Sequence, residues 1–368
     1  MRRIAAGIGV GLLVFAVVFG AFVGYLATGN RPPRRASDGW LRVRHMPEGR
    51  GELATAIVEG RPGGPRLCPS DPCPERLVFA VGGLGGAFAR TSNRVDVFEP
   101  PANAWRRGPD LPEPRHHLAA TGLGDTLYVT GGAAGATDFT PHANVWRLRP
   151  GRTSFERLAE MPEARAGHAM VAIRDRLYVV GGKGSTARVM IFDPAAGWKT
   201  GAPLPGSRDH AAAVAVADRV VVIGGRSDAG LSDRVDIYDT NTDTWSEGPP
   251  LPEANSAAAV AFLSDGLVHV VGGEKPNLIG GAVRDRHFVL DPAARLWLEG
   301  PKPLLAVHGT PAVNIQGRML IIGGSRRAGP LSVLGWTGFS QVFDPALLSA
   351  QPTPSPTTQS SPSPSPSG

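Results

Sequence analysis

Short hydrophobic runs of four to six residues, separated by glycine, proline or aspartate, recur along most of the chain. The stretch 161–205 shows the pattern, with runs at 168–173, at 177–180 before two glycines, and at 189–192 before an Asp-Pro pair. The runs are rich in Val, Ile, Tyr and Phe, which favours strands, and the residues between them favour tight turns. The pattern therefore predicts units of short β-strands, and such a unit needs copies of itself as neighbours to bury both its faces.

A pair of glycines ends the second strand of each predicted unit, and the pairs recur every 43 to 51 residues. They are Gly82-Gly83, Gly131-Gly132, Gly181-Gly182, Gly224-Gly225, Gly272-Gly273 and Gly323-Gly324. Third strands are predicted at 95–98, 145–148, 189–192, 235–238, 287–290 and 340–343. An aromatic residue then marks the fourth strand in five units, namely Trp105, Phe155, Trp198, Trp245 and Trp297. A hydrophobe-proline pair follows most of these aromatic residues at a distance of six, as in Leu111-Pro112, and starts the next unit.

This pattern resembles the kelch repeat, because double glycine, aromatic-Asp-Pro turn and spaced tryptophan occur together over about 300 residues. The resemblance implies an all-β fold, a six-bladed kelch-type β-propeller with four antiparallel strands per blade. Glycine after the second strand permits a positive φ and a close approach by a neighbouring chain. One large aromatic side chain per unit is suited to fill the space between adjacent sheets. We therefore expect the aromatic residues to serve packing.

The sixth unit is incomplete, because no tryptophan follows Asp344-Pro345. The missing element occurs near the other end of the chain, where Trp40 precedes Met46-Pro47 with the same spacing of six residues. We expect residues 39–46 to form the outer strand of the last blade. Such a closure would remove the exposed sheet edges of an open array.

Residues 4–29 contain no charge, and as a helix they would be long enough to cross a bilayer. The alternative is a cleaved signal peptide, but the apolar segment is longer than the usual one and lacks a convincing cleavage site. We therefore predict an uncleaved transmembrane signal-anchor with its basic flank at 1–36, the propeller at 37–348, and a disordered Pro/Ser/Thr tail at 349–368. With the resemblance, this predicts a kelch-repeat protein of the bacterial, membrane-anchored type.

The positive charges on either side of the apolar segment do not decide its orientation. Cys68 and Cys73 lie in one predicted turn between strands, and we expect a disulfide between them in an oxidising compartment. Two cysteines supply only half of a tetrahedral zinc site, and their spacing is not that of a C-x-x-C redox centre. The disulfide and the stalk-like tail favour a single-pass protein of the cell membrane with its propeller on the extracytoplasmic side.

The composition, with 48 glycines and 35 prolines, agrees with a fold of many turns and few long helices. The net charge is +6, and five of the positive charges are arginines that flank the apolar segment. The rest of the chain is therefore nearly neutral, which argues against a nucleic-acid-binding surface. We expect a monomer without a cofactor.

Candidate binding residues recur just after the hydrophobe-proline pairs, where the innermost strand of each blade should begin. Three residues after each proline stand Arg50, Arg115, Arg165, Arg208, Asn255 and Ala306. Five residues after it stand Glu52, His117, Gly167, His210, Ala257 and His308. In a closed ring both sets would surround one mouth of the central channel.

The arginines resemble those with which animal kelch adaptors bind acidic peptides. The resemblance implies a cationic cup for an anionic protein, peptide or glycan, made by the four arginines with Asn255, His117, His210 and His308. The alternative is that an arginine at this point belongs to the repeat and pairs within the fold. A metal site would need several histidines to converge, and we expect none.

The sequence lacks the residue sets that two kinds of kelch-like enzyme need. The cysteine and tyrosine set of copper-radical oxidases and the E-x-x-x-D-x-x-x-H run of iron-dependent specifier proteins are both missing from the sequence. A sialic acid mutarotase-like isomerase is the remaining alternative, with Glu52 beside Arg50 as acid-base residue. A binding or scaffold protein without catalysis is the leading hypothesis.

Overall fold

The computed structural model describes residues 38–59, 76–86, 89–135, 138–184, 187–278 and 280–348. The predicted membrane segment at 4–29, the cysteines 68 and 73, and the tail at 349–368 lie outside the described residues, so those expectations stay predictions. Among the residues described, no helix combines the length and apolar character that a membrane crossing requires.

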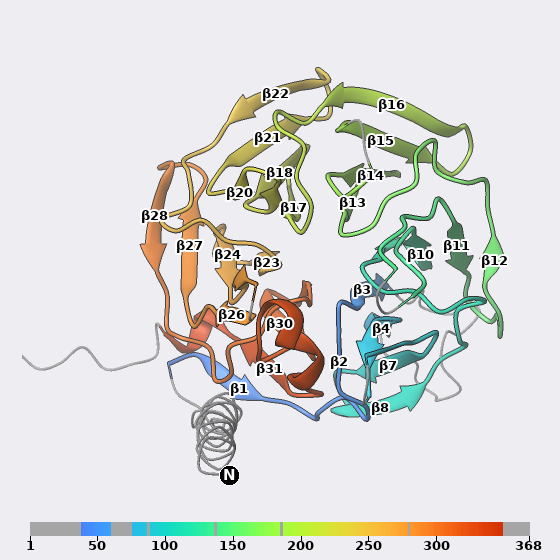
Figure 1. Cartoon of the computed structure of the whole chain (residues 1–368), viewed down its shortest axis with the longest axis horizontal. Helices are drawn as coiled ribbons and strands as arrows, with labels where there is room; N and C mark the ends of the chain where they lie inside the picture. The colour runs from blue at the N-terminus through green and yellow to red at the C-terminus, as the bar shows by residue number, and fades with distance from the viewer. Residues whose placement is uncertain are drawn as a thin grey trace, which may run out of the picture.

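Four-stranded antiparallel sheets are arranged around a common centre, each running from an inner strand to an outer strand at the rim (Figure 1). The inner strands are β3 (Ala54–Glu59), β9 (Ala119–Leu123), β13 (Ala169–Ile173), β17 (Ala212–Val216), β23 (Ala259–Phe262) and β29 (Ala312–Ile315). The second strands are β4 (Arg76–Val81), β10 (Thr126–Thr130), β14 (Arg176–Val180), β18 (Arg219–Ile223), β24 (Val268–Val271) and β30 (Arg318–Ile322). The third strands are β7 (Val95–Glu99), β11 (Val145–Leu148), β15 (Arg188–Asp193), β21 (Val235–Asp239), β27 (His287–Asp291) and β31 (Ser340–Phe343).

The outer strands are β8 (Ala104–Arg107), β12 (Glu156–Arg157), β16 (Gly197–Pro203), β22 (Thr244–Glu247), β28 (Leu296–Glu299) and β1 (Trp40–Arg42). Short ladders outside these sheets are formed by β2 (Arg50–Gly51), β5 (Leu84–Gly85) and β6 (Arg90–Thr91), by β19 (Arg226–Ser227) with β20 (Gly230–Leu231), and by β25 (Glu274–Asn277) with β26 (Gly280–Val283). Two 3-10 helices are present, η1 (Gly329–Leu334) and η2 (Pro345–Leu347). Radially arranged sheets of this kind form a β-propeller, and the all-β prediction is confirmed.

The predicted pairing of the two ends of the domain is confirmed. Strand β1 is the outer strand of the sheet that also holds β29, β30 and β31, with Trp40 opposite Phe343. Figure 1 shows the blue β1 beside the orange-red β31, although they come from opposite ends of the chain. Each inner strand also contacts the next around the centre, and β29 contacts β3. The array therefore has no first and last sheet, and no inner strand lacks a neighbour.

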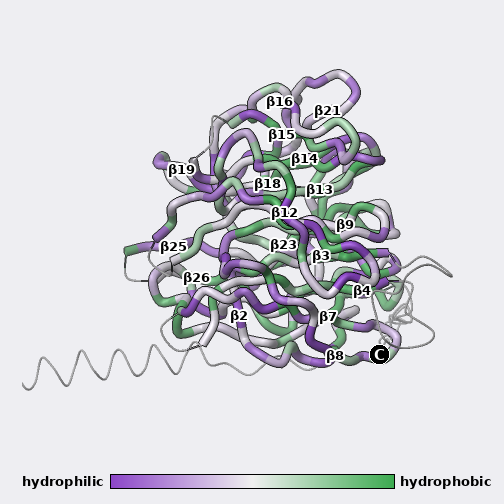
Figure 2. The backbone as a smooth tube through the Cα atoms, turned by 90° about the vertical axis from the view of Figure 1, so that its right-hand side faces the viewer, coloured by the Kyte–Doolittle hydropathy of each residue, from purple (hydrophilic) through white to green (hydrophobic). Residues whose placement is uncertain are grey.

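Hydrophobic side chains fill the space between neighbouring sheets, as the strand pattern predicts. Strands β10 and β14 illustrate this, since all five residues of the first and four of five in the second are buried. In side view the strands β13, β14 and β18 are mostly hydrophobic, whereas the projecting turn at β19 is hydrophilic (Figure 2).

The five tryptophans of the outer strands join successive sheets by a polar contact as well as by packing. Each of these indoles donates from Nε1 to a backbone carbonyl near the outer strand of the preceding sheet, at 2.8 to 3.2 Å: Trp40 to Pro301, Trp105 to Arg44, Trp198 to Ala159, Trp245 to Ala202 and Trp297 to Pro249. Phe155 occupies the corresponding place ahead of β12 and has no such donor. The recurring tryptophan is therefore explained by packing plus this hydrogen bond.

Closure of the ring by Trp40 gives the first prediction. Trp40 is 1 % exposed and packs on Phe343 and His287. We expect Trp40→Ala to lower the free energy of unfolding by about 3–5 kcal/mol, because the change leaves a cavity and removes the hydrogen bond from Trp40 Nε1 to the Pro301 carbonyl. Urea unfolding followed by tryptophan fluorescence or circular dichroism measures the loss.

Leu41 provides a matched control on the same strand, since it is 40 % exposed. Leu41→Ala should change the free energy of unfolding by less than about 0.5 kcal/mol. If Trp40→Ala changed the free energy of unfolding as little as Leu41→Ala, β1 would not contribute to closing the ring.

Candidate functional site

A ring of backbone hydrogen bonds surrounds one end of the central channel. In each sheet, a residue two or three positions before the inner strand donates its N–H to the carbonyl of the equivalent residue in the preceding sheet, at 2.6 to 3.1 Å. The members, called the central ring below, are Glu52, His117, Gly167, His210, Ala257 and Gly309. Gly309 accepts from Glu52 and donates to Ala257, so the cycle is closed. All six residues have a positive φ between 51° and 66°.

The structure corrects the predicted register of the last unit by one residue. Gly309, and not His308, lies in the central ring, and Val307, and not Ala306, accepts from the second glycine of the preceding pair. The reason is local: Pro303 takes the buried position that a hydrophobe holds in the other units, so the proline is one residue early. The sequence prediction counts Ala306 and His308 from Pro303, and both are therefore one residue before the positions that correspond to the other units.

The structure places the arginines of the predicted cup inside the protein. Arg50, Arg115, Arg165 and Arg208 are all buried. Arg50 is 0 % exposed, and it donates to the carbonyls of Gly82 and Arg94 and to the Asp96 carboxylate, at 2.6 to 2.7 Å. Burial lowers the pKa of Arg50 to about 10, although the negative charge of Asp96 opposes this. The guanidinium is thus part of the protein interior.

The other members of this set are held in a similar way. As with Arg50 and Gly82, the first glycine of three further pairs offers its carbonyl to the recurring side chain: Arg165 to Gly181, Arg208 to Gly224 and Asn255 to Gly272. Arg208 also forms a buried ion pair with Asp236 at 2.5 Å. Arg115 donates to Asn144 at 3.0 Å and pairs with Glu113. Most of these side chains therefore hold the glycine turns in place. This agrees with the alternative that the recurring arginines pair within the fold and do not bind a ligand.

The histidines, in contrast, come together at the central ring. His117 Nε2 lies 3.3 Å from Glu52 Oε2, and His210 Nε2 lies 4.0 Å from the same oxygen. His308 Nδ1 lies 3.7 Å from Glu52 Oε1 and 3.6 Å from Glu274 Oε2. Ligand atoms of Glu52, His117 and His210 are all within 4.8 Å of one another, so these three could hold a metal ion.

Groups that the sequence did not single out complete the cluster. Asp209 accepts from His210 Nδ1 at 2.6 Å and pairs with Arg226 at 3.0 Å. Burial would raise the pKa of Asp209, but the hydrogen bond from His210 and the charge of Arg226 lower it to about 2. Burial also holds the pKa of His117 well below its usual value, with further lowering by His210. The sequence contains a signal for these groups: Asp209 directly precedes His210 near a strand start, and Arg226 directly follows the glycine pair Gly224-Gly225.

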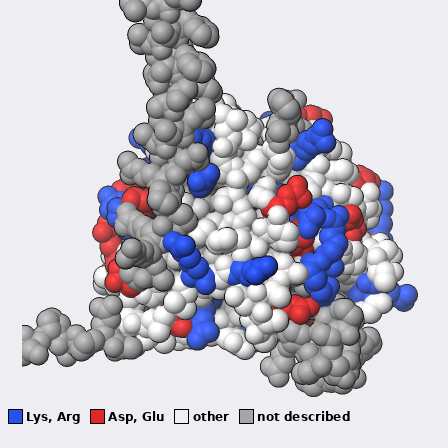
Figure 3. Space-filling model, turned by 90° about the horizontal axis from the view of Figure 1, so that it is seen from below, with Lys and Arg blue, Asp and Glu red and all other residues white. Residues whose placement is uncertain are grey.

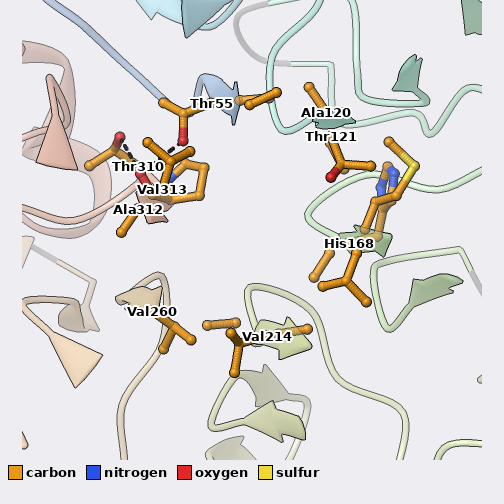
Figure 4. Close-up of a pocket in the computed structure, with 18 of the residues that line it drawn as sticks. Thr55, Ala120, Thr121, His168, Val214, Val260, Thr310, Ala312 and Val313 are labelled. Atoms are coloured by element: carbon orange, nitrogen blue, oxygen red, sulfur yellow. Dashed lines mark hydrogen bonds between the residues drawn. The ribbon is translucent and has the colours of Figure 1, made fainter. Parts of the chain in front are cut away.

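The channel below the central ring is lined by small and apolar side chains. It encloses a cavity of about 500 Å³ between the inner strands. Figure 4 shows Thr55, Thr121, Val214 and Val260, from four different inner strands, directed toward one open space. Much of the lining is alanine, valine and glycine, and Thr55, Thr121, Thr310 and Asn314 add polar groups to it.

Glu52 and Arg50 do not form the acid-base pair that an isomerase would need. Arg50 is directed to Gly82 and Asp96, whereas the Glu52 carboxylate faces histidines. Glu52 therefore has no guanidinium beside it from Arg50, and the mutarotase-like hypothesis loses the contact on which it depended.

The buried arginines give the second prediction. Arg208→Ala should lower the free energy of unfolding by about 2–3 kcal/mol, because Asp236 would stay buried with Arg234 as its remaining arginine partner. Arg90 is exposed in the short strand β6, and Arg90→Ala should be almost neutral. Chemical unfolding of the two variants tests this, and an unchanged stability of Arg208→Ala would restore a ligand-binding role.

His168 gives the third prediction. This side chain is buried beside the channel and bonds to Thr130 Oγ1 at 2.9 Å, and burial lowers its pKa to about 3. In the unfolded chain this histidine binds a proton near pH 6.5, whereas in the folded chain it stays neutral down to a pH of about 3. The free energy of unfolding therefore decreases as the pH falls below 6.5. At pH 5 the loss from His168 is about 2 kcal/mol.

Leucine is a suitable replacement, since Leu53 and Leu118 hold the corresponding position in two other units. His168→Leu should therefore reduce the difference in unfolding free energy between pH 7 and pH 5, measured by urea titration at each pH. An undiminished difference would contradict the assignment.

Comparison with known proteins agrees with the repeat pattern. The family model described as the KLHDC2/KLHL20/DRC7 kelch-repeats domain matches residues 160–324. Kelch-like protein 35 of Mus musculus is 29 % identical over 289 residues, which cover 76 % of this chain and 46 % of that protein. Beta-scruin of Limulus polyphemus is 32 % identical over 87 residues, which cover 21 % of this chain and 10 % of that protein.

The match thus spans less than half the length of either relative, and their names add nothing about ligands. What they share with this chain is the repeat, which here forms the sheets, the glycine turns and the tryptophan contacts described above. The family model and the similarity to Kelch-like protein 35 support a kelch-repeat family for this chain.

Proposed function

We propose that this chain is a six-bladed kelch propeller that binds a protein or peptide partner on the face that carries the central ring. Six four-stranded sheets and a closed cycle of six backbone hydrogen bonds support the blade number. The kelch-repeat relatives support a scaffold or binding role over catalysis.

The observation that carries the binding surface is a set of exposed apolar side chains on the loops between second and third strands. Leu278, at 98 % exposed, projects from the β25–β26 hairpin, Phe139 from the loop before β11, and Val333 and Leu334 from η1. Large side chains that water would surround in the free protein favour a protein or peptide over a glycan.

These loops begin beside the central ring. Ala133, Glu274 and Ser325 open the three loops and pair with His116, Ser256 and His308, each next to a ring position. Phe139 also contacts the rings of His116 and His117 edge-on. The apolar side chains and the histidine cluster therefore belong to one face.

Charge does not select the ligand in the way the arginine cup would have done. The arginines of that set are buried, so they present no cationic surface at the channel mouth. On the side seen from below in Figure 3, basic and acidic side chains lie in mixed groups. The proposed partner is therefore recognised through the exposed apolar side chains named above and not through the arginine cup.

The surroundings of the domain are part of the proposal. Residues 4–29 would tether the propeller to the membrane, with the domain on the extracytoplasmic side and a Cys68–Cys73 disulfide in one loop. The uncharged length of the segment and the position of the cysteines support this.

The fourth prediction tests the binding face. Peptides selected from a displayed random library against the purified full-length chain should bind at least about tenfold more weakly to Leu278→Asp, a loss of about 1.4 kcal/mol. Surface plasmon resonance with each selected peptide measures the affinities.

Leu298 on the outer strand β28 is the matched control, because it is also exposed. Leu298→Asp should keep full affinity. Peptides that are insensitive to Leu278→Asp but sensitive to Leu298→Asp would place the binding surface at the rim and refute the proposal.

A further inference from the structure

We propose that Glu52, His117 and His210 form a binding site for a divalent transition-metal ion, Zn²⁺ in particular, at the rim of the central channel. This site goes beyond the proposed binding of a partner, and it does not depend on that proposal. Two imidazoles and one carboxylate form a ligand set that suits Zn²⁺ and leaves a fourth position open.

Hydrogen bonds fix which nitrogen of His117 is free. His116 Nε2 lies 2.7 Å from the Gly135 carbonyl, which can only accept, so this nitrogen carries the hydrogen. The neutral His116 ring then accepts at Nδ1, and its partner there is His117 Nδ1. His117 must donate from Nδ1, which leaves His117 Nε2 as a bare lone pair directed at Glu52.

His210 is oriented in the same way by a carboxylate. Asp209 Oδ1 accepts from His210 Nδ1, so the neutral ring presents a bare Nε2 toward Glu52. A carboxylate behind a histidine is the usual arrangement around protein-bound metals, since it fixes the ring and increases its basicity as a ligand.

The distances fit an ion more closely than they fit a contact without one. A bare imidazole nitrogen and an ionised carboxylate oxygen at 3.3 Å are two acceptors that face each other without a hydrogen between them. Ligand atoms about 2.0–2.1 Å from a tetrahedral ion lie about 3.3 Å apart. His117 and Glu52 already have that separation, and His210 Nε2, at 4.0 Å from the same oxygen, would have to move closer.

A second buried group directs an unused lone pair into the same cluster. His308 is 2 % exposed, and its Nε2 donates to the Arg327 carbonyl at 2.7 Å. Its Nδ1 has no hydrogen-bond partner among the described residues, and it lies between Glu52 and Glu274. A buried acceptor between two carboxylates is unfavourable unless a positive charge is close.

Negative charge exceeds positive charge in the ion pairs of the cluster. Glu52, Asp209 and Glu274 contribute three carboxylates, and in the described part of the chain Arg226 is the one arginine in ion pairs with them, binding Asp209 and Glu274. A divalent cation would compensate the remaining charge. Arg226 Nη2 also lies 3.2 Å from His210 Nε2, and the ion would displace this contact while the two ion pairs can stay.

The site is reached from two sides. Glu52, His117 and His210 line the end of the channel, and the two histidines also line a separate cavity of about 210 Å³ with Phe139 and Lys183. The open fourth position can therefore take a water molecule or an oxygen from a ligand on the binding face.

Zinc binding by the tag-free full-length chain gives the fifth prediction. After dialysis against Zn²⁺ and removal of free ion, elemental analysis should find one Zn²⁺ per chain. Titration calorimetry should show His117→Gln and Glu52→Gln to weaken binding on the order of 100-fold, because each removes a ligand. Co²⁺ in the same site should give the visible absorption of a four-coordinate ion.

Matched variants separate this site from others. His45 is exposed and outside the cluster, so His45→Gln should keep full affinity. A Cys68→Ser, Cys73→Ser variant should also keep it, and Arg226→Gln should bind Zn²⁺ more tightly. Circular dichroism of the metal-free variants shows whether each is folded, and His210→Gln serves if Glu52→Gln is not.

Three results would overturn the assignment. These are no stoichiometric Zn²⁺ on the folded chain, full affinity in both His117→Gln and His210→Gln, or loss of the ion in the cysteine variant. Absence of Zn²⁺ would mean that a proton shared between Glu52 and a histidine balances the cluster instead.

Discussion

The closed cycle of backbone hydrogen bonds in the central ring is the constraint on which the arrangement depends. Each N–H at the end of the channel would be buried without a partner if its neighbour were missing, and such groups are costly to leave unpaired. The neighbour comes from the adjacent sheet, so every sheet satisfies the next, and Gly309 returns the cycle to Glu52. Closure of the rim by β1 completes the same circuit at the outside.

The ring also determines where chemistry can lie. Its members need a left-handed backbone, which glycine adopts freely and other residues adopt at a cost of about 1–3 kcal/mol. Four members, Glu52, His117, His210 and Ala257, adopt it at that cost. Strained non-glycine residues are often functional, and three of these four carry the side chains that converge.

Recurring and non-recurring residues therefore have different roles. In four units the recurring arginine or asparagine binds the carbonyl of the first glycine in a pair, and a buried guanidinium with five donors can bridge that carbonyl and an acid, as Arg208 does. The residues that differ between units, such as Glu52, Asp209 and Phe139, give the face its individual character. In a repeat protein of this kind, the residues shared by all units form the packed sheets, and the residues that differ between units form the binding face.

The sequence alone determined the strands, the turns and the closure, because these depend on local patterns: hydrophobic runs, glycine pairs, and a tryptophan six residues before Met46. It also identified Glu52, His117 and His210 as equivalent positions near one mouth. The tertiary structure decided which side chains face inward, since burial of Arg50 depends on Asp96, 46 residues away. It also decided the register after Pro303 and the approach of Glu52 to His210, because backbone partners from other sheets, and not spacing along the chain, set those positions.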